Sequence, residues 1–330
     1  MAEARVDWNA LHGSAFAGKR CLVTGGLGFI GGHLTEALAG LGATVVILDN
    51  ASGGNRWPYC SGDVCVHEDD IVDPYACEIA ADQCDVAFHL AAKVSVPASV
   101  NDPIAYHTAD ASGTLNVLDA CKRMGVSRVV YSASSSAYGD SQTLPKVESM
   151  PSMPMSPYAA AKLAGEGYCR AYAACYEIDV VSLRYFNVFG PRQNANSAYA
   201  GVIAAFARDL VAGKRPTIFG DGSASRDFTH VDNVVHANLL AARHATRLGG
   251  DVFNVGTGQR VTVSELARKM ASVLDRDDLE PRFQPPRTGD VPHSQAGLDK
   301  PTAVLGYEPI VSFERGLKET VAWYRAQAAA

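Results

Sequence analysis

Short runs of apolar, mostly β-branched residues alternate with longer amphipathic stretches from about position 20 onward. Such short runs are typical of buried strands, and the longer stretches have helical spacing. The pattern predicts strands at Cys21–Thr24, Thr44–Leu48, Val64–His67, Val86–Leu90, Val129–Ser132 and Val180–Arg184, and helices at Phe29–Leu41, Ile104–Met124 and Tyr158–Tyr176. This alternation predicts an α/β fold of the Rossmann type, a doubly wound parallel sheet covered by helices.

The pattern changes after about residue 187, where loops rich in Gly, Pro and Asn separate shorter elements. We therefore expect a sheet domain over residues 1–187 that also receives some later elements, from about 230–257. Residues 188–330 are expected to form mainly a smaller, discontinuous lobe. A ligand pocket between two such lobes is the common arrangement.

Composition narrows the class of protein. The 330 residues are 47% hydrophobic and 19% charged, and 29 Lys and Arg against 35 Asp and Glu leave a net charge of -6. This charge offers no basic face for nucleic acid. We expect a cytoplasmic protein without membrane contact, because the N-terminus is unlike a signal peptide and no apolar run reaches about 18 residues. The eight cysteines form no Cys-x-x-Cys pair, which predicts buried thiols in a reducing compartment.

Glycines follow the first predicted strand directly and open the first helix, at Gly25, Gly28 and Gly31. In this context Gly25 allows a tight turn, Gly28 lets the backbone approach a pyrophosphate, and Gly31 lets helix and strand pack closely. Asp49 ends the second strand, where a carboxylate binds an adenosine ribose and repels a 2′-phosphate. These features predict NAD rather than NADP. A glycine-rich turn without a ligand, and Asp49 as the start of a polar turn, are the alternatives.

Tyr158 and Lys162 are four residues apart, so on a helix their side chains lie on one face. An ammonium beside a phenol favours the phenolate and lowers the pKa of the Tyr from about 10, which makes it a usable base. Ser134 follows the fifth predicted strand, at the end of the sheet where such folds bind ligands. A chance Tyr–Lys spacing and a solvated serine loop are the alternatives.

Taken together, five segments resemble the extended short-chain dehydrogenase/reductases, and within them the UDP-sugar 4-epimerases. They are Gly25–Gly31, Ser134–Gly139, Tyr158 with Lys162, Arg184–Gly190 and Ser225–Phe228. The resemblance covers about residues 18–325 and implies a tightly bound NAD. It implies that Tyr158 takes the proton of the sugar C4 hydroxyl while the C4 hydride passes to NAD, giving a 4-keto intermediate. Ser134 would hydrogen-bond the same oxygen, and Lys162 would also hold the nicotinamide ribose.

The resemblance also implies further contacts, with Arg226 and Arg287 on the diphosphate and Phe219 at the uracil. Beside the residues already named, the predicted NAD contacts are Phe29, Ile30, Asn50, Asp70, Ile71, Leu90, Ala91, Ala92 and Tyr185. The predicted substrate contacts are Ser135, Ser136, Asn187, Ala198, Tyr199, Val202, Phe219, Arg226, Arg287, Asp290 and Ser294. None of the histidines forms a ligand-spaced pair, so no metal is predicted.

Single positions separate neighbouring reactions within this resemblance. Sugar dehydratases carry an acid pair where this chain has Ser135 and Ser136, and decarboxylases carry a Glu at the second of these. Ser294 stands where glucose-restricted epimerases have a bulky Tyr, which leaves room for an N-acetyl group. Gly297 departs from the usual Asp, which predicts a looser turn after Ser294.

We therefore expect a 4-epimerase for UDP-N-acetylglucosamine and UDP-N-acetylgalactosamine, with UDP-glucose and UDP-galactose as further substrates. A UDP-glucuronate 4-epimerase is the alternative, and a non-catalytic nucleotide-binding regulator is an alternative of another class. The helices at 104–124 and 158–176 are apolar on more than one face. In relatives the corresponding helices form a dimer interface, so the resemblance implies a homodimer.

Overall fold

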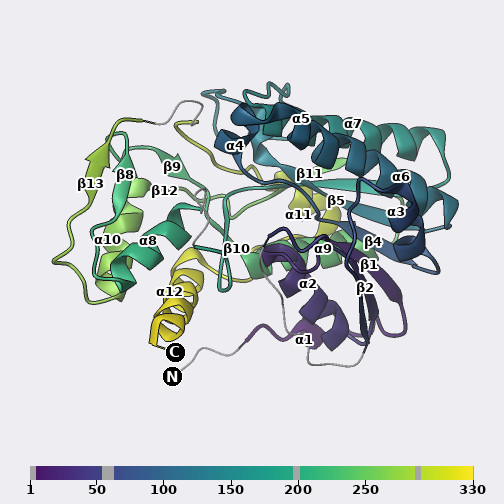
Figure 1. Cartoon of the computed structure of the whole chain (residues 1–330), viewed down its shortest axis with the longest axis horizontal. Helices are drawn as coiled ribbons and strands as arrows, with labels where there is room; N and C mark the ends of the chain where they lie inside the picture. The colour runs from purple at the N-terminus through teal and green to yellow at the C-terminus, as the bar shows by residue number, and fades with distance from the viewer. Residues whose placement is uncertain (1–4, 54–62, 196–200, 287–290, 330) are drawn as a thin grey trace.

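A seven-stranded parallel sheet forms the centre of the protein, in the order β11-β6-β5-β4-β1-β2-β3 (Figure 1). The computed structural model describes residues 5–53, 63–195, 201–286 and 291–329. The strands are β1 (Arg20–Thr24), β2 (Thr44–Leu48), β3 (Val64–His67), β4 (Val86–His89), β5 (Arg128–Ser134), β6 (Asp179–Tyr185) and β11 (Val252–Val255). The predicted Rossmann-type fold is confirmed, with β11 as a strand that the apolar pattern did not single out.

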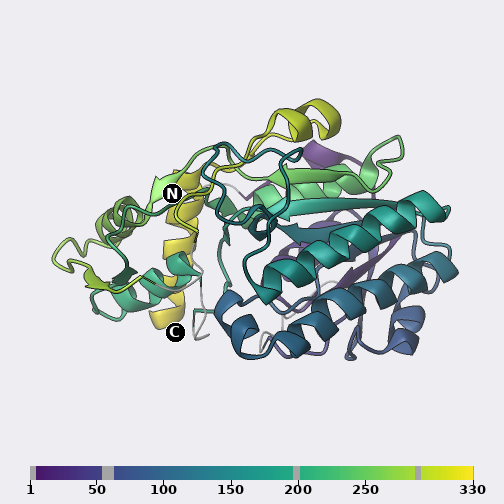
Figure 2. The same cartoon turned by 90° about the horizontal axis from the view of Figure 1, so that it is seen from above.

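Helices cover both faces of the sheet, and each face has its own apolar core (Figure 2). One face carries α1 (Trp8–His12), α2 (Phe29–Gly40), α9 (Val231–Arg243) and α11 (Asp299–Leu305). The other carries α3 (Pro74–Ala81), α6 (Gly113–Arg123) and α7 (Pro157–Cys175). Because the strands other than the partly exposed edge strand β3 are buried on both sides, they are nearly continuous apolar runs, as expected for a parallel sheet.

The helix predicted over 104–124 is interrupted. After α4 (Val96–Asn101), the chain forms α5 (Pro103–Tyr106), a π-helical turn at His107–Ser112, and then α6. Within the turn, the buried Asp110 carboxylate accepts a hydrogen bond of 2.7 Å from the backbone N of Lys93. The spacing of apolar residues in the sequence does not reveal such a turn, because the helical hydrophobic pattern continues on either side of it.

The second lobe has a core of its own, built by α8 (Val202–Val211), α10 (Val263–Val273) and α12 (Phe313–Ala329). Beside them lie the parallel pair β8 (Thr217–Phe219) and β13 (Arg282–Gln284), and the short strands β7 (Val188–Phe189), β9 (Ser225–Arg226), β10 (Thr229–His230) and β12 (Val261–Thr262). The sheet domain receives α9 and β11, within the 230–257 segment. It also receives Leu305 and Tyr307, which pack in the core with α2 and α9 and which the sequence pattern did not assign to it.

Most of the described cysteines are buried as predicted, but Cys65 and Cys175 are exposed. Cys65 lies on the edge strand β3, and Cys175 is the last residue of α7, so neither has a neighbouring layer to cover it. Cys60 lies outside the described residues. Within the described ranges, no helix is both long and apolar enough to cross a membrane.

An ion pair at the amino ends of β5 and β6 joins three distant segments. Arg128 and Asp179 are nearly buried, with Nε 2.7 Å from Oδ2. Arg128 also donates to the backbone carbonyls of Ala242 and His244, at 3.0 and 2.6 Å, and Asp179 accepts from the backbone N of Leu248. The pair therefore ties the end of α9 to the sheet.

Replacing Arg128 with Met is expected to lower the free energy of unfolding by about 3 kcal/mol, because Asp179 would remain buried without its cation. Urea unfolding followed by circular dichroism measures the loss. Arg123→Met is the matched control, since that exposed arginine pairs with Asp119 on the surface of α6 and should contribute less than about 1 kcal/mol. Equal losses in the two variants would contradict the assignment.

Candidate active site

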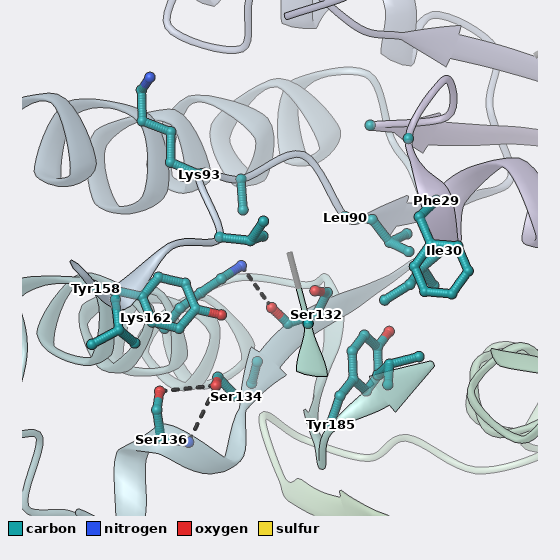
Figure 3. Close-up of a pocket in the computed structure, with 18 of the residues that line it drawn as sticks. Phe29, Ile30, Leu90, Lys93, Ser132, Ser134, Ser136, Tyr158, Lys162 and Tyr185 are labelled. Carbon is teal, nitrogen blue, oxygen red and sulfur yellow. Dashed lines mark hydrogen bonds between the residues drawn. The ribbon is translucent and has the colours of Figure 1, made fainter. Parts of the chain in front are cut away.

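A cleft of about 1300 Å³ lies along the carboxyl ends of the strands and extends to the second lobe (Figure 3). It opens between β1 and β4, where the strand order reverses and where open α/β sheets bind ligands. Most of the residues singled out in the sequence line this cleft. They are Gly25, Gly28, Phe29, Ile30, Gly31, Asp49, Asn50, Asp70, Ile71, Leu90, Ala91, Ala92, Ser134, Ser135, Ser136, Tyr158, Lys162, Tyr185, Asn187, Val202, Arg226 and Ser294.

Five other positions stand apart from these. Phe219 lies at the end of β8 and is not among the residues that line the cleft, so its contact with uracil remains a prediction. Ala198, Tyr199, Arg287 and Asp290 lie outside the described residues.

The glycine loop has the shape that a dinucleotide pyrophosphate requires. Gly25 has a φ of +73°, and a Cβ there would lie 2.7 Å from the backbone N of Ala91. A Cβ on Gly31 would lie 2.1 Å from the carbonyl oxygen of Gly25. Gly28 is the N-cap of α2 and makes no side-chain cap hydrogen bond, so the positive end of this helix faces the cleft. The loop therefore fits a bound NAD.

Three polar side chains line the end of the cleft beside β2. The Asp49 carboxylate accepts hydrogen bonds from the backbone N of Leu27 at 2.9 Å and of Ala51 at 2.8 Å. It thereby holds the glycine loop against the end of β2. Asn50 donates from Nδ2 to Asp70 Oδ2 at 2.7 Å, which joins the turns that follow β2 and β3. These contacts place the predicted ribose and adenine residues side by side.

Tyr158 and Lys162 lie on the first two turns of α7, whose start is set by the N-cap Ser156 and by Pro157. The Lys162 ammonium donates to the backbone carbonyl of Ser132 at 2.9 Å (Figure 3). Ser134 ends β5, and its Oγ accepts from Ser136 Oγ at 2.8 Å. This bond leaves the Ser134 proton available for an acceptor in the cleft.

Electrostatics at Tyr158 differ from the sequence expectation. Burial raises the pKa of Tyr158 to about 12, and the hydrogen bond from Ser134 opposes that rise. Burial lowers the pKa of Lys162, while the Asp110 carboxylate raises it. The expected net lowering of the Tyr158 pKa is therefore wrong for the polypeptide itself, because desolvation of the phenolate outweighs the favourable contacts.

The substrate-side residues meet where the second lobe approaches β6. Ser294 Oγ donates to Asn187 Oδ1 at 3.4 Å. Arg226 donates from Nη1 to the carbonyl oxygens of Ser225 and Pro292, both at 3.0 Å. The guanidinium is thus held at the cleft wall by backbone from two segments.

The turn after Ser294 is held closely, contrary to the expectation drawn from Gly297. The backbone N of Ala296 donates to Asp227 Oδ2 at 3.1 Å, and that of Gly297 to the carbonyl of Lys146 at 2.7 Å. A Cβ on Gly297 would lie 2.7 Å from a side-chain carbon of Val147. Glycine therefore allows this turn to pack against residues 146–147, which anchors the segment that carries Ser294.

Some cleft residues escaped the sequence reasoning. Tyr106 lies edge-on to the Tyr158 ring, with centroids 6.4 Å apart, but it belongs to no motif. Lys93 also lines the cleft, after β4. His293 lines the cleft as well, and its Nδ1 is hydrogen-bonded to Ser225 Oγ at 2.9 Å. Its position next to Ser294 in the sequence could have indicated it.

One group of possible metal ligands occurs among the residues that the structure describes. His230, Asp232 and Glu319 bring their ligand-type atoms within 4.8 Å of one another, and none of the three is among the residues that line the cleft. The Glu319 carboxylate is already paired with Arg315, at 2.9 Å. The absence of a functional metal remains a prediction.

Comparisons with known proteins agree with this geometry. Residues 21–256 match the model of the NAD dependent epimerase/dehydratase family. The chain is 40% identical to a UDP-glucose 4-epimerase of Mycolicibacterium smegmatis over 312 residues, which are 93% of this chain and 98% of the relative.

Two solved structures are similar over nearly the whole chain. A UDP-N-acetylglucosamine 4-epimerase from Methanobrevibacter ruminantium, in complex with UDP-N-acetylmuramic acid, is 37% identical with a TM-score of 0.89, and the match covers 94% of this chain and 99% of that one. The Thermus thermophilus UDP-glucose 4-epimerase in complex with NAD is 35% identical with a TM-score of 0.84, over 93% and 99% of the two chains. With the glycine loop shaped for a dinucleotide, these matches establish that the chain belongs to the NAD dependent epimerase/dehydratase family, whose cofactor is NAD.

Proposed function

We propose that this protein is a UDP-sugar 4-epimerase that acts on UDP-N-acetylglucosamine and UDP-N-acetylgalactosamine, with tightly bound NAD. The observation that carries the proposal is the convergence of Ser134, Tyr158 and Lys162 on the cleft that the glycine loop also lines. The names of the similar proteins, which include 4-epimerases of both UDP-glucose and UDP-N-acetylglucosamine, support the reaction class and leave the sugar open.

The side chains divide the chemistry at C4. Tyr158 takes the proton of the C4 hydroxyl, and Ser134 donates a hydrogen bond to the same oxygen as the carbonyl forms. Lys162 keeps a positive charge in the buried site, which favours the phenolate. NAD, which the glycine loop would hold, would supply the acceptor and donor of the C4 hydride when bound. For inversion the 4-keto sugar must turn over, so Arg226 is assigned to hold the diphosphate while the sugar moves.

The sugar preference is proposed from the space around Ser294. The small side chain of Ser294 makes a hydrogen bond of 3.4 Å from its Oγ to Asn187 Oδ1. A Tyr ring at this position would fill a volume comparable with that of an acetamido group. Ser135 and Ser136 supply hydroxyls at the cleft where a dehydratase or decarboxylase needs carboxylic acids. Simple epimerisation is therefore the proposed reaction.

The test is to incubate the purified protein with UDP-glucose, UDP-N-acetylglucosamine and UDP-glucuronate in parallel, and to separate the 4-epimers by chromatography. We expect turnover of the N-acetylated sugar, with weaker turnover of UDP-glucose. Conversion of UDP-glucuronate alone would refute the substrate and favour the uronate epimerase.

Replacing Ser294 with Tyr is expected to lower kcat/KM for UDP-N-acetylglucosamine by about a hundredfold, since steric exclusion of one group contributes about 1–3 kcal/mol. Turnover of UDP-glucose should stay within about threefold. Ser294→Ala is the matched control and should keep both activities, because it removes a hydroxyl without filling space. Equal losses on the two sugars in the Tyr variant would overturn the specificity argument.

We also propose a homodimer built on α6 and α7 with the neighbouring α4 and α5. Large apolar side chains are exposed on these helices, at Val100, Ile104 and Tyr168. A second copy of the chain would cover them. Sedimentation velocity measures the assembly, and a monomer at micromolar concentration would refute it.

A further inference from the structure

The segment from Gly139 to Ser156 connects the two halves of the proposed catalytic pair. It follows directly on the turn Ser135–Tyr138, beside Ser134, and it ends at the N-cap of α7, two residues before Tyr158. It contains no helix and no strand of the sheets. A few backbone bonds hold it, with Lys146 N donating to the carbonyl of Gln295 and Met153 N to that of Ala137, both at 2.8 Å, and side-chain contacts complete its path.

A buried ion pair stands behind this segment. Arg184, on β6, donates from Nε to Glu166 Oε1 at 2.9 Å and from Nη2 to Glu166 Oε2 at 2.7 Å. The two side chains are 4% and 6% exposed. Glu166 lies one helical turn beyond Lys162 on α7, so the guanidinium is anchored to the helix that carries Tyr158. A buried pair of this kind contributes little net stability, but it defines geometry closely.

The same guanidinium also holds the connecting segment. Arg184 Nη2 donates to Ser152 Oγ at 2.9 Å, and the guanidinium lies 4.6 Å from the centre of the Tyr138 ring. Tyr138 in turn donates its hydroxyl proton to Asn254 Oδ1 at 2.7 Å. Asn254 Nδ2 donates to the carbonyl of Lys146, in the middle of the segment, at 2.9 Å. One polar network therefore contacts Tyr138 just before the segment, Lys146 in its middle and the half-buried Ser152 near its end.

We propose that Arg184 is a positioning residue for the epimerase reaction, which fixes the 139–156 segment through Ser152 and Tyr138 so that Ser134 stays in hydrogen-bond reach of Tyr158. This inference rests on the proposed function. Arg184 is not among the residues that line the cleft, so it acts through the segment and not on the substrate.

The sharpest test removes only the bond that ties the segment to the guanidinium. Ser152→Ala keeps the Arg184–Glu166 pair, so the fold is retained and the melting temperature should change by less than about 3 °C. We expect kcat to fall about tenfold, the scale of one hydrogen bond to a charged group, with KM changed less than about twofold.

The pH profile separates positioning from simple destabilisation. The Tyr158 hydroxyl is influenced by Ser134 from β5, by Tyr106 and Asp110 from the 103–112 segment, and shares its helix with Lys162. The hydrogen bond from Ser134 lowers the pKa of Tyr158, so loosening that bond raises the pKa of Tyr158. Since Tyr158 acts as a base when deprotonated, the acid limb of kcat should move to higher pH in Ser152→Ala.

Two comparisons complete the experiment. Ser149→Ala is the matched control, because it removes a hydroxyl from the same segment. Ser149 is exposed, and its hydroxyl makes no hydrogen bond to the residues that the structure describes. The change should leave kcat and the acid limb unchanged. In a Ser134→Ala background, Ser152→Ala should shift the acid limb no further, because the bond through which it acts is already gone.

The possible outcomes are distinct. A loss of kcat with an unmoved acid limb, or an equal loss in the Ser134→Ala background, would overturn the positioning role while leaving the epimerase proposal intact. Absence of UDP-sugar turnover by the unmodified protein would overturn both. A shift of the limb in Ser152→Ala but not in Ser149→Ala would establish the role.

Discussion

Replacement of Tyr158 with Phe is expected to lower kcat for UDP-sugar epimerisation by about a thousandfold while the protein keeps its bound NAD. The variant loses only the hydroxyl that accepts the C4 proton, and a positioned general base contributes about 10²–10⁴-fold. The ring remains, so its edge contact with Tyr106 and the packing of α7 are retained. NAD released by denaturation and measured by chromatography should equal that of the unmodified protein.

Tyr168→Phe provides the matched control for this experiment. Tyr168 lies on the same helix, 38% exposed, and removal of its hydroxyl should leave kcat within about twofold. Substantial turnover by Tyr158→Phe would show that another group takes the proton. A regulator that binds nucleotides without catalysis would have no turnover to lose, which separates that alternative from an enzyme.

The acid limb of the same reaction should report the ionisation of Tyr158. Burial raises its pKa to about 12 in the polypeptide, and the base acts only when deprotonated. Below the apparent pKa of the working complex, kcat should therefore rise about tenfold for each pH unit. The positive charge of a bound nicotinamide ring would favour the phenolate, so this apparent pKa should lie well below 12. A rate independent of pH on the acid side would contradict the role.

The second large effect is expected from Gly31→Ala, which should abolish retention of NAD on purification. A Cβ at this position would lie 2.1 Å from the carbonyl oxygen of Gly25 and 2.9 Å from the Cα of Gly26. Both are backbone atoms, so α2 must move away from the glycine loop and carry its positive end with it. We expect the affinity for NAD to fall by at least about a hundredfold and the free energy of unfolding to fall by about 2 kcal/mol.

Gly40→Ala distinguishes this close contact from a general effect of alanine. Gly40 is the last residue of the same helix, and its Cβ would meet no atom within 4 Å. The change should leave NAD binding intact and stabilise the helix by less than about 1 kcal/mol. Titration calorimetry with NAD measures the first quantity, and urea unfolding measures the second. Retained affinity in Gly31→Ala would refute the proposed pyrophosphate site.

Local patterns in the sequence identified much of the fold and of the site. Each predicted strand is present. All but the partly exposed edge strand β3 are buried on both faces and must be apolar throughout, which is visible in a few consecutive residues. Gly25 to Gly31 and the Tyr158–Lys162 pair each lie within one turn or one helix, so their spacing alone indicates their arrangement. Their common cleft follows from the parallel sheet, which brings the carboxyl ends of the strands to one edge.

Contacts between distant segments could not be predicted in the same way. The Arg184 guanidinium contacts Glu166, Ser152 and Tyr138. Arg128 likewise joins Asp179 to the end of α9. The spacing of these residues in the sequence does not indicate that they meet. The π-helical turn around Asp110 and the raised pKa of Tyr158 were also missed. The raised pKa depends on burial, which is a property of the packed molecule rather than of neighbouring residues.

The sequence by itself therefore determined which side chains could do chemistry and which strand ends would carry them, because apolar periodicity and glycine spacing are local properties. Only the tertiary structure decided how these groups are held. It placed Ser294 beside Asn187 from 107 positions away, and it put an arginine behind the segment that separates Ser134 from Tyr158. The physical reason is that desolvation and long-range hydrogen bonds exist only once the two lobes and the two faces of the sheet have packed.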